Sequence, residues 1–405
     1  MKENKTKPDI RFKGFTEAWE QRKLGDICSE IGDGLHSAPT YDNNGEYYFI
    51  NGNNLVNGHI EIDELETKRV SSYTFASNDK CLDEKTVLLS INGTIGNLAY
   101  YAGEKVMLGK SAAYLKVKDI KKEFLYTSLQ TEMILNNFML SLTGTTIKNL
   151  GLEAIKKTSI LIPGYDEQTK ISKHFNDLDN LITLHQRECD QLKELKKSML
   201  KKMFPRDESS IPEVRFAGFT DAWEQRKLGE IVGIYDGVHQ TPKYQDSGIM
   251  FLSVENISTL QSTKYISEED FKRDYKVYPQ ENDILMTRIG DVGTTNVVTD
   301  NTLKAYYVSL ALLKYKNTNP YFLSNAMQSN YVQKGLANRT LKTAVPMKIN
   351  KDEIGKVDVI LTAAVEEQSK IGSYFKNLDN FITLHQRELE ILKNLKKTCL
   401  KRMFI

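Results

Sequence analysis

Two stretches of the chain, at residues 166–204 and 366–405, place apolar residues at alternating steps of three and four. This spacing is the a/d seam of a coiled coil, and here it lasts for about five heptads. It predicts two long helices, each about 57 Å long at about 1.5 Å per residue, which suits a spacer better than a core helix. The seam positions that we assign are Ile171, Leu178, Ile182, His185 and Leu192 in the first helix and Ile371, Leu378, Ile382, His385 and Leu392 in the second.

Each predicted seam contains one histidine, His185 or His385, at the same place in the same seven residues, ITLHQRE. A matched pair of histidines is compatible with a metal site or with catalysis. We assign these two no Cys, Asp or Glu that recurs at ligand spacing in both copies. We therefore interpret both as polar seam positions that fix the register of the helices, as a buried Asn does in other coiled coils.

The residues before each long helix follow a different pattern, with short apolar, β-branched or aromatic runs between Gly, Asn and Asp turns. This pattern covers 28–165 and 232–365, and one helical stretch lies late in each segment, at 123–140 and 320–336. Such runs predict strands, so we expect two α/β (α+β) domains with a mostly mixed or antiparallel sheet. The clearest predicted strands are 47–50, 86–91, 113–117 and 159–163 in the first segment and 249–254, 283–288, 305–315 and 357–361 in the second.

The whole series of parts occurs twice. PDIRFKGFTEAWEQRKLGDI (8–27) returns as PEVRFAGFTDAWEQRKLGEI (212–231), and the long helix returns without a gap, whereas the middles match only in fragments. The chain is therefore a pseudo-symmetric tandem repeat whose ends match and whose middles differ. Matching surfaces suit two copies of one partner, and divergent surfaces suit two different targets. The predicted parts are the N-terminal segment 1–27, the first domain 28–165, the first long helix 166–204, the linker and second N-terminal segment 205–231, the second domain 232–365, and the second long helix 366–405.

Composition narrows the class of protein. The chain has 405 residues with 55 basic and 53 acidic side chains, a net charge of +2, which neither requires nor excludes nucleic acid. We find no apolar run long enough to cross a membrane and no secretory signal, and the four cysteines are scattered. These features predict a cytoplasmic protein with reduced thiols.

Two segments resemble catalytic motifs, but each departs from the pattern that its motif requires. GEKVMLGKS (103–111) resembles a phosphate loop but places five residues between its glycines, where the motif needs four. NPYF (319–322) resembles an amino-methyltransferase motif but lacks its second proline, so we expect Pro320 to open a helix instead. We assign no catalytic residue, no metal ligand and no cofactor to this chain.

Three features together resemble the specificity (S) subunit of type I restriction–modification systems over nearly the whole chain. They are AWEQRKLG opening each copy (18–25 and 222–229), the TGTTIKNL–SILIP–DEQ passage (143–168), and the long helices that begin at EQ. The second copy departs from the pattern at 339–362, where RTLKTAVPMKIN replaces TGTTIKNL.

The resemblance implies a non-catalytic DNA-recognition subunit. In that family each variable domain is a target-recognition domain that reads one half of a split, asymmetric DNA site, and the two long helices pack as an antiparallel coiled coil between the halves. Two methyltransferase (M) subunits bind the repeated regions and methylate adenine at N6 with S-adenosylmethionine. Restriction (R) subunits add cleavage that needs ATP and Mg²⁺.

We select candidate residues within this frame from loop position and residue type, because Arg, Asn and Thr side chains read base edges and Lys contacts phosphates. For partner contact we choose the two tryptophans and the outer leucines of the helices, Trp19, Trp223, Leu181, Leu184 and Leu384; simple anchoring of the N-terminal segments is the alternative for the tryptophans. The DNA candidates are Asn92, Lys110, Thr145, Thr146 and Lys148 in the first domain and Arg288, Asp291, Arg339, Lys342 and Thr343 in the second.

Three other functions remain open at this point. The chain could be a stand-alone bipartite DNA-binding protein, such as a repressor, which would bind tightly without a partner and with a steep salt dependence. It could be a coiled-coil interaction scaffold whose domains are inert towards DNA. An enzyme that uses the near phosphate loop would bind ATP.

Overall fold

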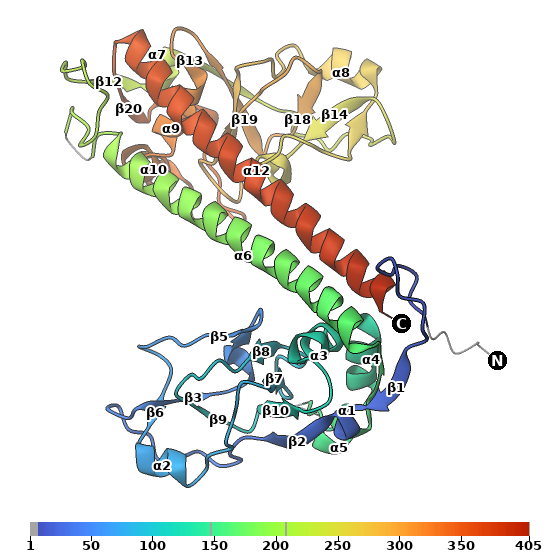
Figure 1. The fold of residues 1–405 in the computed structure, drawn as a ribbon. Coiled ribbons are helices and arrows are strands. Elements are labelled where there is room, and N and C mark those ends of the chain that lie inside the picture. Colours follow the sequence, from blue (N-terminus) through green and yellow to red (C-terminus); the bar gives the residue numbers. More distant parts are fainter. Residues whose placement is uncertain (1–6, 146–147, 207–208, 405) are drawn as a thin grey trace. The chain divides into compact units, whose positions relative to one another are not determined.

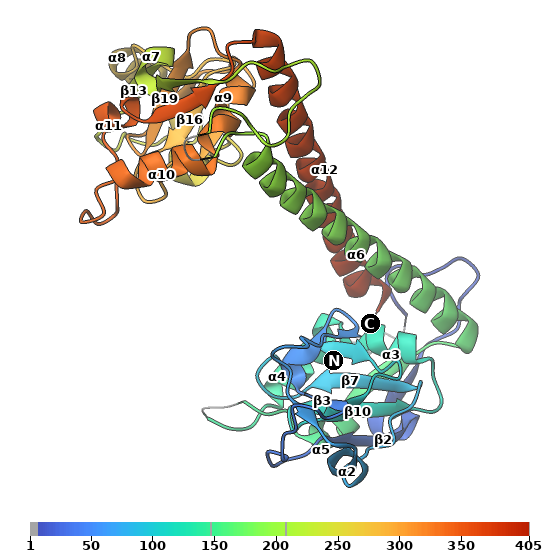
Figure 2. The same ribbon diagram turned by 90° about the vertical axis from the view of Figure 1, so that its left-hand side faces the viewer.

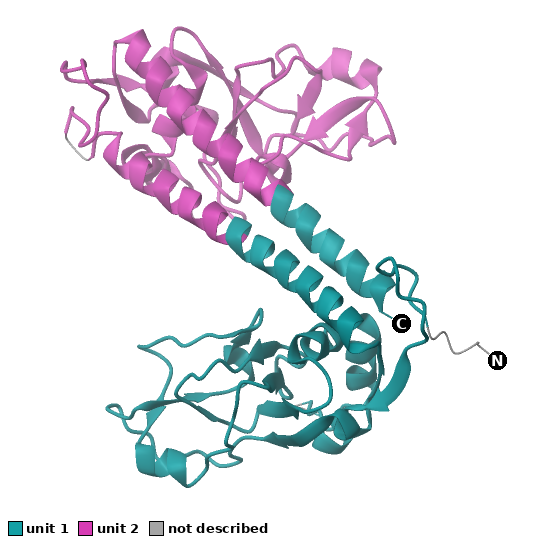
Figure 3. Cartoon of the chain, viewed as in Figure 1, with its two compact units in different colours: residues 1–185, 388–405 teal, residues 186–387 magenta. Residues whose placement is uncertain are grey.

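The chain folds into two compact units, which Figure 3 colours separately. A computed structural model describes residues 7–145, 148–206 and 209–404. Unit 1 contains Met1–His185 and Glu388–Ile405, and unit 2 contains Gln186–Arg387. Both boundaries fall inside the long helices, so each unit is built from one domain and parts of both helices.

A four-stranded antiparallel sheet forms the centre of the domain in unit 1, in the order β2-β10-β7-β8; Figure 1 labels its strands. Its strands are rich in β-branched and aliphatic residues, and every residue of β7 is buried. The strands are β2 (Cys28–Asp33), β7 (Thr86–Ser90), β8 (Leu98–Tyr100) and β10 (Ala112–Val117).

Smaller sheets and short helices complete this domain (Figure 1). A mixed three-stranded sheet has the order β6-β3-β9, and the repeated N-terminal segment contributes β1, which pairs antiparallel with β11. The strands are β1 (Glu20–Lys23), β3 (Tyr47–Ile50), β4 (Leu55–Val56), β5 (His59–Ile60), β6 (Arg69–Val70), β9 (Val106–Leu108) and β11 (Ser159–Ile162). The helices are α1 (Leu24–Ile27), α2 (Ser72–Ala76), α3 (Lys122–Leu129), α4 (Glu132–Leu140) and α5 (Leu152–Lys157).

Unit 2 repeats this plan with an equivalent four-stranded sheet, β13-β19-β16-β17, and a mixed sheet, β15-β14-β18. The strands are β12 (Glu224–Lys227), β13 (Val232–Asp236), β14 (Ile249–Leu252), β15 (Tyr265–Ile266), β16 (Ile284–Thr287), β17 (Thr295–Val297), β18 (Lys304–Tyr306), β19 (Leu310–Tyr315) and β20 (Asp358–Leu361). The helices are α7 (Leu228–Ile231), α8 (Glu268–Asp274), α9 (Pro320–Met327), α10 (Asn330–Arg339) and α11 (Lys351–Gly355).

The predicted domain class and mixed or antiparallel sheets are confirmed, and two details of the prediction are wrong. Each single helical stretch divides into two helices, and in the second domain Ser329 caps the new helix by accepting a hydrogen bond from the Val332 amide at the start of α10. The run 305–315 divides into β18 and β19, which lie in different sheets. Pro320 is the first residue of α9, as expected, with Asn319 as its cap.

The two long helices, α6 (Tyr165–Lys202) and α12 (Val365–Met403), pack side by side and antiparallel within each unit (Figures 1 and 2). In unit 1, Lys396 contacts Asp179 and Glu388 contacts His185, so residue numbers rise along one helix as they fall along the other. The predicted antiparallel coiled coil is therefore present.

Each long helix also joins the core of a domain. Ile171, Phe175 and Leu178 are buried in the unit 1 core, and Met403 from α12 lies in the same cluster. Ile371, Phe375 and Leu378 are buried in the unit 2 core in the same way, with Met203, which directly follows α6. The helix pair is thus continuous with both cores. None of the described helices is long and apolar enough to cross a membrane.

Candidate nucleic-acid interface

One end of the main sheet in unit 1 gathers four loops, whose described residues we call the first loop end: residues 34–46, 91–97, 109–111, 141–145 and 148–149. The register places Asp33 opposite Ala113 and Ser90 opposite Ala112, so the ends of β2 and β7 and the start of β10 lie together. Isolated bridges from Asn149 to both Asn92 and Thr143 tie the last loop to the one that follows β7. Loops far apart in sequence therefore form one surface.

The described DNA candidates of the first domain all lie on this surface. Lys110, Thr145 and Lys148 are exposed, and Asn92 is half-buried beside Asn149. Thr146 lies outside the described residues. The exposed lysines and hydroxyl suit phosphate contact and base reading, so the structure brings this candidate set together.

Residue-type reasoning overlooked Asp33 and His36 at the same loop end. Asp33 is half-buried, and its carboxylate lies 2.8 Å from Nε2 of the exposed His36 ring. The carboxylate thereby orients an exposed imidazole towards solvent. The sequence signal was available, because DGLH (33–36) returns as DGVH (236–239) in the second copy.

Unit 2 has an equivalent second loop end, formed by residues 237–248, 288–294, 307–309 and 340–349. Asp236 pairs with Ala311 and Thr287 with Leu310, which places the corresponding strand ends together. The candidates Asp291, Lys342 and Thr343 are exposed on these loops. They are accessible to a ligand.

Arg288, proposed above as a base-reading residue, is instead buried, with 7% of its side chain exposed. Its guanidinium pairs with the Asp236 carboxylate, and burial lowers the pKa of Arg288. The equivalent position in the first domain is Ile91, which is also buried. Arg288 is therefore an internal ion-pair partner, and its assignment as a DNA-reading residue is corrected.

Arg339 occupies an intermediate position. It lies at the end of α10, is half-buried, and its Nη1 is 3.3 Å from a carboxylate oxygen of Glu353. An arginine held by a carboxylate must exchange that partner before it can bind a phosphate or a base. Lys342 and Lys348, both exposed, are the better cations of this loop.

Matched ion pairs fasten the N-terminal segments to the starts of the long helices. Arg11 donates to both carboxylate oxygens of the buried Glu167 at 2.6 and 2.7 Å, and Arg215 donates to Glu367 at 2.5 and 2.9 Å. These bonds raise the pKa of both arginines. Burial acts to raise the pKa of Glu367, but its hydrogen bonds, with Arg215 foremost, outweigh this and leave the pKa below its ordinary value.

The two tryptophans lie in the same anchored region. Trp19 and Trp223 are each only 3% exposed. Trp19 packs edge-on against Phe124 and Phe404, and Trp223 packs in the same manner against aromatic residues of unit 2. Buried side chains offer no surface to a partner, so their position favours the alternative that they anchor the N-terminal segments.

The seam between the helices carries ordered polar pairs. Lys396 lies 2.6 Å from Asp179 in unit 1, and Lys196 lies 2.6 Å from Asp379 in unit 2. Of the other predicted seam residues, Ile182, Leu192, Ile382 and Leu392 are half-buried. Each of these two ion pairs joins a lysine of one long helix to an aspartate of the other, and both pairs favour the same register of the helices.

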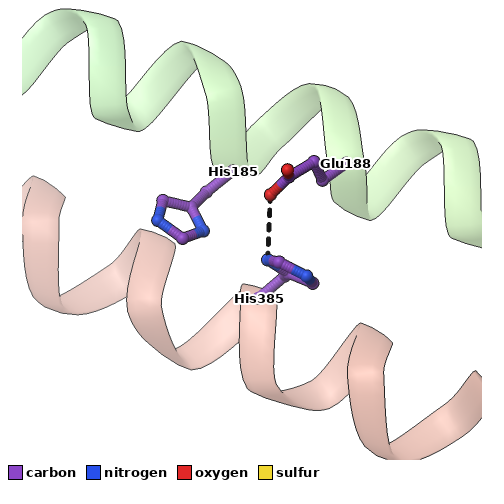
Figure 4. A group of neighbouring side chains, drawn as sticks. All are labelled: His185, Glu188 and His385. Atoms are coloured by element: carbon purple, nitrogen blue, oxygen red, sulfur yellow. Dashed lines mark ion pairs between the residues drawn. The ribbon is translucent and has the colours of Figure 1, made fainter.

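The seam histidines have carboxylate partners that the sequence interpretation overlooked. His185 Nδ1 lies 3.3 Å from Glu388 in unit 1, and His385 Nδ1 lies 3.4 Å from Glu188 in unit 2. Figure 4 shows the second pair, with His185 one turn earlier on α6. The glutamates follow the histidines by three residues in both ITLHQRE copies. These cross-helix pairs support a role in fixing register.

A second apolar stripe runs along each helix, displaced from the seam, at steps of three, four, three and four from residue 181 or 381. Its apolar members, including the candidates Leu181, Leu184 and Leu384, are between 40% and 65% exposed. Seven exposed apolar side chains, six of them at matched positions of the two helices and Ile391 without an apolar equivalent, form a surface that suits another helix or a hydrophobic groove. They are Leu181, Leu184, Ile391 and Leu395 in unit 1 and Leu195, Phe381 and Leu384 in unit 2.

The near phosphate loop has a geometry that does not suit nucleotide binding. Residues 109–111 form the turn between β9 and β10, so a strand follows where a phosphate loop requires the N-terminus of a helix. This agrees with its incorrect glycine spacing.

Comparison with known proteins identifies relatives for the whole arrangement. The family described as "Type I restriction modification DNA specificity domain" matches residues 16–194 and again residues 220–394. The MjaVIII specificity subunit of a type I restriction enzyme from Methanocaldococcus jannaschii is 23% identical over 398 residues, covering 94% of this chain and 91% of that protein. The putative MjaX specificity subunit of the same organism is 21% identical over 416 residues, with the same coverage.

A solved structure shares the fold over the full length. The S subunit of a type I restriction–modification system from M. genitalium superposes with a TM-score of 0.69 at 17% identity, covering 98% of this chain and 99% of that one. At this identity the likeness concerns the fold alone.

Proposed function

Since the chain belongs to the type I restriction–modification DNA specificity family, we propose that each domain reads one half of a bipartite, asymmetric DNA site. The observation that supports this proposal is the pair of loop ends. The two domains have equivalent sheets, but the loop sequence is LTGTTIKNL in the first domain and LKTAVPMKIN in the second. One scaffold with two different recognition surfaces suits two different half-sites.

The helix pair sets the distance between the half-sites in this proposal. Two continuous helices of 38 and 39 residues, with polar pairs at matched seam positions, form a stiff spacer. About 57 Å of helix compares with the 34–36 Å repeat of the duplex, which is enough to separate two contacts by a turn or more.

Two methyltransferase subunits are the proposed partners of the repeated surfaces. The two apolar stripes of α6 and α12 support two equivalent docking places, one on each unit. The specificity subunit is the non-catalytic member of such an enzyme. S-adenosylmethionine for adenine N6 methylation, and ATP and Mg²⁺ for cleavage, would be bound by the methyltransferase and restriction subunits. We expect the complex in the cytoplasm, where it meets DNA.

The decisive experiment expresses this chain with a type I methyltransferase subunit in a host free of restriction and maps N6-methyladenine by long-read sequencing. We expect a new mark at one split, asymmetric motif that is absent without this chain. Co-purification of the two proteins is measured in parallel.

The alternatives give different results. A pair that co-purifies but makes no new mark would deny the specificity role and favour a scaffold. A chain that does not bind the methyltransferase, yet protects a bipartite site by itself with a steep salt dependence, would be a stand-alone DNA-binding protein.

A further inference from the structure

A hairpin projects from the second loop end, at residues 341–348, and Figure 2 shows it extending beyond α10. Leu341 bridges Lys348, and the Leu341 amide donates to the Lys348 carbonyl at 2.7 Å. Lys348 also bridges Ile289, while the Gly290 amide donates to the Met347 carbonyl at 2.8 Å. The base of the hairpin is therefore fastened to the turn that follows β16.

The tip of this hairpin is apolar and open to solvent. Val345 at the tip is 99% exposed, and Met347 near it and Leu341 at the base of the hairpin are 45% and 44% exposed. These apolar side chains are in contact with water, and binding to a partner would bury their surface.

Positive charge surrounds the apolar tip. Lys342 and Lys348 are exposed on either side of it, and residues 340–350 contain no Asp or Glu. An apolar centre flanked by two exposed lysines complements a DNA groove, where base edges lie between two rows of phosphates, although the neighbouring turn carries the exposed Asp291.

The corresponding loop of the first domain has different chemistry. The sequence there is LTGTTIKNL (142–150), with Gly144 and Thr145 in place of the lysine and threonine that begin the second hairpin and without a proline. The two domains therefore carry different sequences at equivalent loops.

We propose that the hairpin of the second domain reads its half-site through apolar contact with thymine C5-methyl groups in the major groove. Val345 and Met347 make this contact, and Lys342 and Lys348 bind the flanking phosphates. The inference rests on the proposed function and adds the recognition chemistry of one domain. Thymine is the base that offers a methyl group to an apolar side chain in the major groove, so this contact distinguishes T·A from the other base pairs.

Deoxyuridine scanning tests the contact, because deoxyuridine lacks only the C5-methyl group of thymidine. The complex of this chain with its methyltransferase subunit is titrated with duplexes of its own site, each with one thymine replaced in either half. The half read by the second domain is identified by exchanging residues 232–365 for another target-recognition domain. We expect at least one replacement in that half to weaken binding roughly fourfold, the effect of one buried methyl-sized group.

The hairpin variant Val345→Ala/Met347→Ala should bind the unmodified site more weakly and lose its sensitivity to that deoxyuridine. Leu303→Ala is the matched control, because Leu303 is 43% exposed on the same unit but lies before β18, away from the loop end; it should remain sensitive. Lys342→Ala/Lys348→Ala should reduce the slope of log K against log salt by about 2, one for each phosphate contact removed.

Three outcomes would overturn the inference. They are a half-site whose binding is indifferent to every thymine methyl group, a hairpin variant that keeps full sensitivity, and a hairpin variant that loses the methyltransferase subunit while keeping its DNA affinity. Each leaves the proposed function intact provided that the wild-type complex binds a bipartite site. If the wild-type complex binds no bipartite site, both the inference and the proposed function are wrong.

Discussion

At the scale of single residues, equivalent positions of the two domains carry different interactions. Asp33 orients the exposed His36, whereas the equivalent Asp236 pairs with the buried Arg288, and the equivalent of Arg288 in the first domain is Ile91. An arginine in a loop of a DNA-binding protein suggests contact with guanine, but burial decides otherwise here. The Arg288 side chain lies in the interior of its own domain, where it is paired with Asp236 and is not accessible to DNA.

Arg288→Leu should therefore reduce stability and leave base preference unchanged. Removing the arginine leaves the half-buried Asp236 carboxylate without its partner, and we expect a loss of about 2 kcal/mol in the free energy of unfolding. Chemical denaturation of the chain measures this. The double variant Arg288→Leu/Asp236→Asn should recover most of the loss, because it removes both charges; an unchanged half-site preference with normal stability in Arg288→Leu would contradict the assignment.

Glu367 predicts a pH dependence of stability with a defined sign. Its pKa in the folded chain lies below the ordinary value of 4.5, so the carboxylate stabilises the fold above that pH, and this contribution is lost as the pH falls through the folded value. Glu367→Gln should be less stable than the wild type at pH 7, and the difference should shrink as the pH falls below about 4.5. Thermal unfolding across a pH series checks this, with the exposed neighbour Glu366→Gln as a control that should show little difference.

At the scale of elements, the long helices combine two functions in one sequence. Their seams hold the pair together through apolar and polar contacts, and their second stripes leave apolar side chains exposed at matched positions. The repeat conserves both features while the loops differ. This division agrees with a common partner and with two separate DNA half-sites.

Deleting ITLHQRE from both helices (182–188 and 382–388) should shorten the gap in the DNA site. Seven residues are about two helical turns, so the seam keeps its face, and about 10 Å of length is lost. This equals about three base pairs at 3.4 Å each. Binding to a library of sites with different gaps measures the change, and an optimum at the original gap would refute the spacer.

The second stripe can be tested with Leu184→Glu and Leu384→Glu. Burying each leucine against a partner contributes about 1.5–3 kcal/mol, so a charge at one site should weaken that docking place at least tenfold. We expect one methyltransferase subunit to remain bound in either single variant and none in the double variant, measured by mass photometry. Thr183→Glu, exposed on another face of α6, should keep both subunits; a double variant that still binds two would move the interface elsewhere.

At the scale of the whole molecule, the duplication produces two equivalent units. The order in which their parts follow one another along the chain differs between the two. The Ile10 amide donates to the Arg402 carbonyl in unit 1, and the equivalent Val214 amide donates to the Lys202 carbonyl in unit 2. In unit 2 the docked segment follows its helix in sequence, whereas in unit 1 the two come from opposite ends of the chain. Each unit therefore contains an equivalent N-terminal segment, an equivalent domain, and parts of both long helices.

Exchange of one domain should change one half of the site. If residues 28–165 are replaced by the first domain of another specificity subunit, the methylome should show a new sequence in one half, with the other half and the gap unchanged. The anchored segments and the second loop end lie outside the exchanged residues, which is the physical reason for this expectation. A change in both halves would show that the domains do not recognise DNA independently.

The sequence by itself determined the repeat, the long helices, the strand-rich domains and the absence of a recognisable catalytic motif, because periodic burial and duplication are written locally along a chain. Loop position also placed Lys110, Thr145 and Lys148 on one surface correctly. Only the tertiary structure decided which polar side chains are accessible. It buried Arg288 and the two tryptophans, paired each seam histidine with a glutamate of the opposite helix, and exposed Val345 at the tip of a hairpin. Burial and ion pairing depend on neighbours that are distant along the chain, 52 residues apart for Asp236 and Arg288 and on opposite long helices for the histidine pairs, and no local pattern carries that information.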